Sequence, residues 1–122
     1  MSKQLTKAEE EIMQVLWSLK IASVKEVIAE LPVPKPAYNT VSTIIRILEV
    51  KEFVGHQQKG RGYIYHPLIE KSDYSNDSLH KLMNGYFEGS FKSMVSFFMK
   101  ENKMDIQELE SILKEVDKNK KL

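Results

Sequence analysis

Two helix-start signals and a cluster of prolines divide the N-terminal part of the chain into short segments. Thr6 with Glu9, and Ser23 with Glu26, have the spacing of capping boxes, in which a hydroxyl and a glutamate three residues later bond to each other's backbone N–H groups. Apolar residues recur at helical spacing after each box. The stretch Pro32–Pro36 cannot continue a helix, because proline disfavours helical geometry in the residue before it. The pattern predicts two short helices and a rigid turn.

A third helix is predicted from about Asn39, taken as its N-cap, to Lys51. Its apolar face is Val41, Ile44, Ile45 and Leu48. The opposite face carries Asn39, Thr40, Ser42, Thr43, Arg46 and Ile47. Exposed helix faces usually carry Lys and Glu, whereas short hydroxyl and amide groups with one arginine suit close approach to base edges and phosphates. The pattern therefore favours a DNA-reading helix, the alternative being Ser and Thr that merely decorate a helix N-terminus.

Two β-prone runs follow, Phe53–Gln57 and Gly62–His66, and Pro67 is expected to end the second. The connection Gln58–Arg61 contains a turn glycine and positive charge at Lys59 and Arg61. Three short helices followed by a hairpin with a basic tip is the order of a winged helix-turn-helix, in which the third helix enters the major groove and the wing reaches phosphates. We therefore expect a mostly α fold with a small β-hairpin wing.

Charge is balanced over the whole chain, with 18 basic and 17 acidic residues, so composition alone does not indicate a nucleic-acid partner. Between Val33 and Tyr65 the local net charge is +3. This excess comes from Lys35, Arg46, Lys51, Lys59 and Arg61 against Glu49 and Glu52. A local basic stripe is compatible with a DNA-facing surface, although solvated faces also carry such charge. The absence of cysteine and of any long apolar run leads us to expect a cytoplasmic protein that does not cross the membrane.

The C-terminal part is unusually apolar for its length. We expect a winged-helix domain over residues 1–70 and a helical segment over 71–122, interrupted by Gly85, Gly89 and Ser90. A last helix is expected to start at Asp105. So short a segment cannot bury these side chains alone, which favours burial against a second copy of the chain over folding back on the N-terminal domain. The candidate dimerisation residues are Leu82, Tyr86, Phe87, Phe91, Val95, Phe98, Leu109 and Leu113.

Catalysis is not indicated. His56, His66 and His80 lie in different predicted elements and do not form a paired metal motif. The short Lys59–Gly62 stretch lacks the length and the following helix of a phosphate-binding loop. We expect neither an enzyme nor a cofactor. The alternative to DNA binding is a winged helix that binds protein, for which the third helix would expose apolar or acidic side chains instead.

Three stretches resemble the penicillinase-repressor (BlaI/MecI/CopY-type) family: Leu5–Trp17 at the start, Tyr38–Arg46 in the third helix and Gly60–Tyr65 in the hairpin. The region from Tyr86 to Leu113 is similar to the family's dimerisation part. The resemblance implies a homodimeric repressor whose partner is a palindromic double-stranded DNA operator. It implies groove contacts by Asn39, Thr40, Ser42, Thr43 and Arg46, and backbone contacts by Lys59 and Arg61.

The resemblance also implies a membrane sensor metalloprotease system that ends repression by cleavage within the dimerisation segment. The matching stretch is Val95–Met99, where Ser96, followed by Phe97, stands in place of the asparagine that precedes the cleaved bond. The cysteine cluster of the copper-responsive branch is missing, which excludes that mode of metal sensing. Ile47 replaces a second basic residue, and Glu52 replaces a common turn glycine before the wing.

Overall fold

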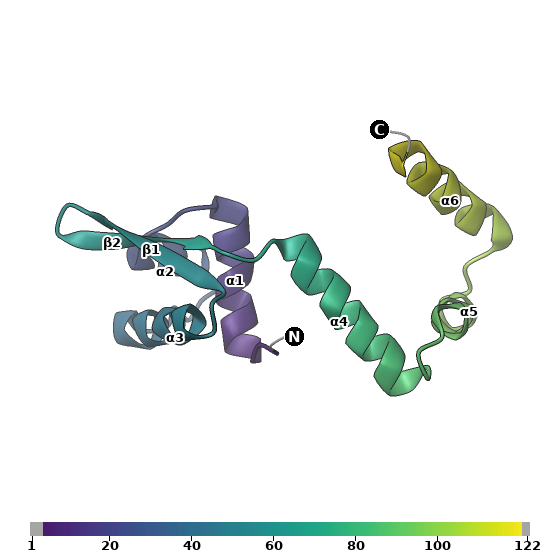
Figure 1. Cartoon of the computed structure of the whole chain (residues 1–122), viewed down its shortest axis with the longest axis horizontal. Coiled ribbons are helices and arrows are strands. Elements are labelled where there is room, and N and C mark those ends of the chain that lie inside the picture. Colours follow the sequence, from purple (N-terminus) through teal and green to yellow (C-terminus); the bar gives the residue numbers. More distant parts are fainter. Residues whose placement is uncertain (1–3, 121–122) are drawn as a thin grey trace. The chain divides into compact units, whose positions relative to one another are not determined.

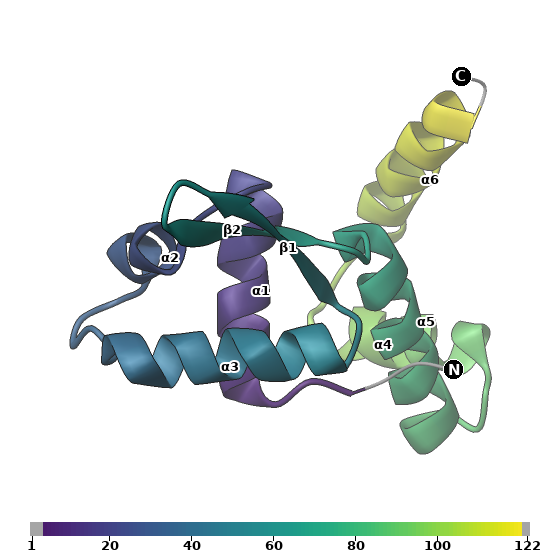
Figure 2. The same ribbon diagram turned by 60° about the vertical axis from the view of Figure 1, so that its left-hand side comes forward.

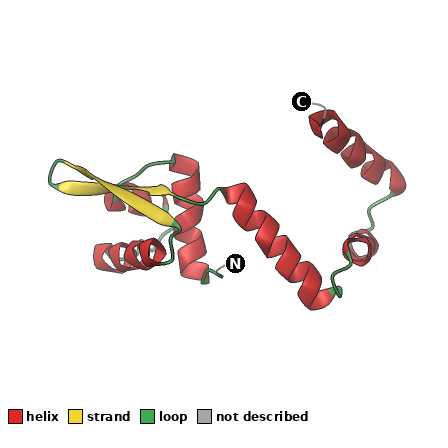
Figure 3. Cartoon of the chain, in the orientation of Figure 1, coloured by secondary structure: helices red, strands yellow, loops and turns green. Residues whose placement is uncertain are grey.

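The computed structural model describes residues 4–120, and the side chains of residues 4–116. Its elements are α1 (Lys7–Leu19), α2 (Val24–Glu30), α3 (Tyr38–Val50), β1 (Val54–Lys59), β2 (Gly62–Pro67), α4 (Lys71–Tyr86), α5 (Phe91–Glu101) and α6 (Ile106–Lys120) (Figures 1 and 3). The chain divides into two compact units, residues 1–77 and 78–122. The mostly helical fold with one antiparallel hairpin confirms the predicted fold class.

The first unit packs three helices and the hairpin around one core (Figure 2). Its fully buried side chains come from the three helices, from β1 and from the turn that precedes β1. They are Met13 and Leu16 of α1, Val27 of α2, Val41, Ile45 and Leu48 of α3, Phe53, and Val54 of β1. Burying large apolar side chains stabilises each by about 1.5–3 kcal/mol, so this core positions α3 and the hairpin relative to each other.

The first turn of α4 belongs to this unit. The Tyr74 ring lies 5.8 Å from the centroids of both Trp17 and Phe53. The Trp17 indole N–H donates to the carbonyl oxygen of Ile69 at 2.8 Å, which fixes the segment leading into α4. The first unit therefore extends past residue 70, the domain boundary expected from the sequence.

The helix starts follow the predicted signals except at α3. Both capping boxes are formed, with Thr6 accepting from the Glu9 amide at 3.2 Å and Ser23 from the Glu26 amide at 3.2 Å. The prediction that Asn39 caps α3 is wrong, because the N-cap is Ala37, in extended geometry and without a side-chain bond. The helix thus spans 38–50 instead of 39–51, and Asn39 lies in its first turn.

The hairpin has a tighter turn than predicted. Strand β1 starts at Val54 and strand β2 ends at Pro67. Lys59 pairs with Gly62, so the two residues Gly60 and Arg61 form the turn. Gly60 has φ +62°, a left-handed conformation that costs glycine little. Gln58 and Lys59, predicted to lie in the loop, belong to β1 because the pairing continues up to the turn.

The second unit consists of helices without a core of their own. None of residues 78–116 is buried. The chain bends between α4 and α5 at residues 87–90, where Gly89 has φ +77° and Ser90 caps α5. Gly85 does not interrupt the helix as predicted, because it lies inside α4. The predicted capping start at Asp105 is confirmed by its bond from the Glu108 amide at 2.8 Å.

Candidate nucleic-acid interface

Helix α3 presents a polar surface opposite its buried face. Asn39, Thr40, Thr43 and Arg46 are exposed, and Ser42 is half-buried. Two of the short side chains, Ser42 and Thr43, are about one helical turn from Arg46, which is close enough for one patch to contact adjacent groups of a ligand. Four of the five groove residues expected from the sequence therefore lie open to solvent on the helix.

Two further exposed residues of α3 modify this surface. Tyr38, 51% exposed, stands in the first turn next to Asn39 and was missed because the helix was predicted to start one residue later. Ile47 is 42% exposed, which matches its predicted position on the polar face. The polar groups are thus accompanied by one aromatic and one aliphatic side chain. Such side chains suit apolar contact with the methyl group of thymine.

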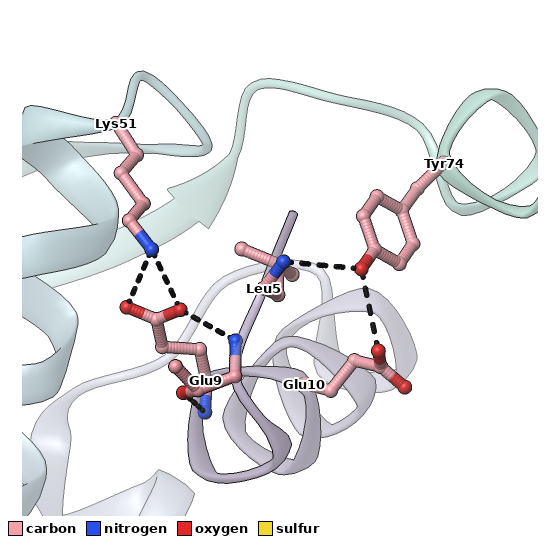
Figure 4. A network of polar contacts seen from close by, with 6 residues as sticks. Leu5, Glu9, Glu10, Lys51 and Tyr74 are labelled. Atoms are coloured by element: carbon pink, nitrogen blue, oxygen red, sulfur yellow. Dashed lines mark hydrogen bonds and ion pairs between the residues drawn. The ribbon is translucent and has the colours of Figure 1, made fainter. Parts of the chain in front are cut away.

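The C-terminal end of α3 is tied to α1 by an ion pair (Figure 4). The Lys51 ammonium donates to both carboxylate oxygens of Glu9, at 2.8 and 3.0 Å. Glu9 is only 5% exposed, and its carboxylate also accepts from the Thr6 amide at 2.8 Å. Burial by itself would raise the pKa of Glu9, but the Lys51 and Thr6 hydrogen bonds outweigh it and hold that pKa below its usual value. The first capping box therefore also anchors the candidate recognition helix.

Tyr74 of α4 holds the opposite side of the same helix start (Figure 4). Its hydroxyl accepts from the Leu5 amide at 3.4 Å and donates to the Glu10 carboxylate at 3.3 Å. These bonds join residues more than sixty positions apart in sequence. Sequence spacing gives no signal for such a contact, so this part of the scaffold could not be predicted.

Two of the five residues in the predicted basic stripe hold the scaffold together. Lys51 pairs with Glu9, as described. The Lys35 ammonium donates to the carbonyl oxygens of Ile28 at 3.1 Å and Ala29 at 2.8 Å, and also to that of Leu31. A cation there bonds the carbonyls at the end of α2 and complements the negative end of the helix dipole. The stripe is therefore narrower than the local charge suggested, with Arg46, Lys59 and Arg61 left as its outward-facing cations.

The hairpin carries the remaining basic residues at its tip. Arg61 lies in the turn and Lys59 at the adjoining end of β1, and both are exposed. Hydrogen bonds from Ser23 hold the pKa of Glu26 below its usual value, and the positive charge of Lys59 adds to this effect. Glu26 at the start of α2 therefore partly offsets the positive charge of Lys59, whereas Arg61 lies in the turn itself.

Two other kinds of feature are absent from the described part of the chain. Within residues 4–116, no group of three or more His, Asp or Glu side chains could hold a metal ion. In the same part of the chain, none of the helices is long and apolar enough to span a membrane. The polar face of α3 and the basic hairpin tip thus remain the candidate interface.

Comparison with known proteins identifies the architecture. A family model described as "Penicillinase repressor" matches residues 5–118. The penicillinase repressor of Bacillus licheniformis is 33% identical over 97% of this chain and 95% of its own length. The methicillin resistance regulatory protein MecI of Staphylococcus aureus (strain N315) is 29% identical over 90% of this chain and 93% of its own.

Two solved structures of BlaI each match about three fifths of this chain. The solution structure of the DNA binding domain of the repressor BlaI has a TM-score of 0.52 and 35% identity, covering 61% of this chain and 94% of that one. The monomeric form in complex with the blaP half-operator has a TM-score of 0.50 and 34% identity, covering 59% and 89%. The family match over almost the whole length, with a winged helix in the matching position, shows that this chain belongs to the penicillinase repressor family.

Proposed function

We propose that this protein is a homodimeric transcriptional repressor that binds a palindromic DNA operator through α3 and the wing. The observation that carries the proposal is the pairing, in one domain, of an exposed Asn, Thr and Arg surface on α3 with an exposed basic hairpin tip. Asn39, Thr40, Ser42, Thr43 and Arg46 would contact the groove. Lys59 and Arg61 would contact phosphates. The matching structure of BlaI, which is in complex with a half-operator, supports DNA binding by this domain.

The exposed apolar surface of the second unit supports dimerisation. Of the proposed dimerisation residues, Leu82, Tyr86, Phe91, Phe98 and Leu113 are exposed, and Phe87, Val95 and Leu109 are half-buried. Leu82, Tyr86, Phe87 and Phe98, with Met94 and Phe97, line a cavity of about 710 Å³. An apolar surface of this extent is unusual on a monomer, and a two-fold dimer would match the symmetry of a palindromic operator. We therefore assign the second unit to dimerisation and the first unit, which includes the first turn of α4, to DNA binding.

DNA binding is tested by titrating the protein onto the promoter region of its own gene and onto scrambled DNA of equal length, at several salt concentrations. Salt-sensitive binding that prefers the promoter is expected. Arg46→Ala should weaken promoter binding by about 1–3 kcal/mol if Arg46 reads a base. Lys114→Ala, which removes one positive charge from α6, is the matched control and should leave binding unchanged. Equal, weak binding to both DNAs by the wild-type protein would favour a protein-binding winged helix instead.

Dimerisation is tested by sedimentation equilibrium of the full chain. We expect a dimer at micromolar concentration, and a shift toward monomer in Phe91→Asp, since this side chain is 65% exposed in the single chain. Lys92→Asp changes the charge of the next residue of α5 and serves as the control. A wild-type protein that remains monomeric would contradict the assignment of the second unit.

Induction by a membrane sensor metalloprotease system would act at Ser96 and Phe97. Both residues are exposed, but they lie inside α5, so a protease would have to unwind that helix to reach the bond. Intact-mass spectrometry after co-expression with a sensor protease of the family would detect cleavage. Cleavage of Ser96→Asn but not of the wild type would show that Ser96 prevents this route of induction.

A further inference from the structure

One side-chain contact joins the recognition helix to the base of the wing. The Glu49 carboxylate, one residue before the end of α3, bonds through Oε2 to Nδ1 of His56 in β1. The side chains are 26% and 46% exposed, so the pair lies at the domain surface and not in the core. Neither residue belongs to the groove or tip residues assigned above.

The surroundings of His56 are aromatic on one side and charged on the other. On β2, the Tyr63 ring lies 5.1 Å away in an edge-to-face arrangement and the Tyr65 ring lies 6.1 Å away. Burial raises the pKa of the Tyr65 hydroxyl, Glu49 raises it further and Arg46 opposes the increase, with smaller contributions from Tyr38 and Tyr63. The groups that contact the histidine are therefore Glu49 from α3, and Tyr63 and Tyr65 from β2.

His56 stands between the anchored and the exposed parts of the wing. On the anchored side, Val54 is buried and Tyr65 exchanges backbone hydrogen bonds with Ala22, at 3.0 and 2.8 Å. On the other side, residues 57–63 are all exposed. A two-stranded hairpin is marginally stable by itself, so the direction of its tip depends on side-chain contacts near its base. The Glu49–His56 pair is such a contact, and it connects β1 of the wing to α3.

We propose that His56 is a positioning residue, which acts through Glu49 to fix the wing against α3 so that both elements reach the same DNA site. The inference rests on the proposed DNA-binding function. The contact joins an imidazole nitrogen to a carboxylate, and hydrogen bonds to a charged group are stronger than those between neutral groups. Removing the Glu49 carboxylate should therefore loosen the wing and weaken DNA binding.

The first test uses the DNA-free full-length protein and measures amide hydrogen exchange of residues 57–63, corrected for intrinsic exchange rates. In Glu49→Ala the opening of the wing should increase about tenfold, because one hydrogen bond to a charged group is lost. Glu49→Gln keeps a neutral oxygen as an acceptor, so its wing should open less than that of Glu49→Ala and more than that of the wild type. Wing protection in Glu49→Ala equal to that of the wild type would overturn the inference.

The second test measures affinity for the promoter fragment. Glu49→Ala should bind about tenfold more weakly than the wild type. Glu49→Gln should bind more weakly than the wild type and more tightly than Glu49→Ala. Glu52→Gln removes the same charge three residues further along and should not weaken binding. Equal affinities of Glu49→Ala and the wild type, or the same change in affinity in both Gln variants, would contradict the positioning role. If the wild type does not prefer the promoter, the proposed function fails, whereas the exchange experiment still decides whether the pair holds the wing.

Discussion

Replacing Lys51 by methionine should destabilise the first unit by about 2 kcal/mol at pH 7. The substitution keeps the length and apolar stem of the side chain but removes two hydrogen bonds to Glu9, at 2.8 and 3.0 Å. Breaking a fully buried ion pair costs about 3–5 kcal/mol, and an exposed pair contributes about 0–1 kcal/mol. The Glu9 side chain is 6% exposed and that of Lys51 is 30% exposed, and the Thr6 amide still bonds to Glu9, so an intermediate value is expected.

The pH dependence gives the sign of this effect. In the wild type the pKa of Glu9 is held below its ordinary value of 4.5, so its stabilising contribution is present above that value and is lost as the pH falls through the lowered pKa. Without Lys51, only the Thr6 hydrogen bonds oppose the effect of burial, so the pKa of Glu9 is higher than in the wild type and the variant loses less stability as Glu9 is protonated. The difference between the two proteins should therefore be largest near pH 7 and shrink toward pH 3.

Urea unfolding followed by tryptophan fluorescence measures this difference. The chain has a single tryptophan, Trp17, which contacts Tyr74 and bonds to Ile69, so its emission reports the first unit. Glu9→Gln keeps a side-chain acceptor for the Thr6 amide and should cost less, about 1 kcal/mol, because the exposed Lys51 is solvated more easily. The double variant should be more stable than additivity predicts. A deficit for Lys51→Met below about 0.3 kcal/mol, or one that grows toward acidic pH, would refute this reasoning.

Three further predictions concern the scaffold. Lys20→Gly should raise the melting temperature of the first unit by about 4–8 °C. Lys20 is exposed and has φ 72°, a backbone strain of about 1 kcal/mol that glycine removes. An unchanged or lower melting temperature in thermal unfolding would contradict this prediction. Gly55→Ala should destabilise by about 1–2 kcal/mol in urea, because its Cβ would lie 2.9 Å from His66 Nε2 and 3.2 Å from Leu68 Cδ2, whereas Gly62→Ala meets nothing within 4 Å and is the control. Lys35→Met should lower stability by about 1 kcal/mol through the lost carbonyl bonds at the end of α2. Unchanged stability with weakened DNA binding would instead show Lys35 to be a phosphate contact.

Local chemistry determined the element order and most helix starts. Thr6, Ser23 and Asp105 each bond to a backbone amide three residues later, a contact that depends only on neighbouring residues. The turn at Gly60 and the exposed polar face of α3 follow from equally short-range patterns. The sequence places the N-cap of α3 two residues too late, at Asn39, because Ala37 takes the extended N-cap geometry without any side-chain bond that a sequence signal could reveal.

The roles of the charged residues were decided by the tertiary structure. Lys35 and Lys51 look like members of one basic stripe with Arg46 and Arg61, yet one caps α2 and the other pairs with a glutamate 42 residues away. The Glu49–His56 contact similarly depends on the turn between α3 and β1. An ammonium or carboxylate has the same charge in any sequence, but its partner is whichever group the packed core brings within hydrogen-bonding distance. The sequence therefore determined which groups could bind DNA, and the packing of α1, α2 and β1 against α3 determined which of them remain available.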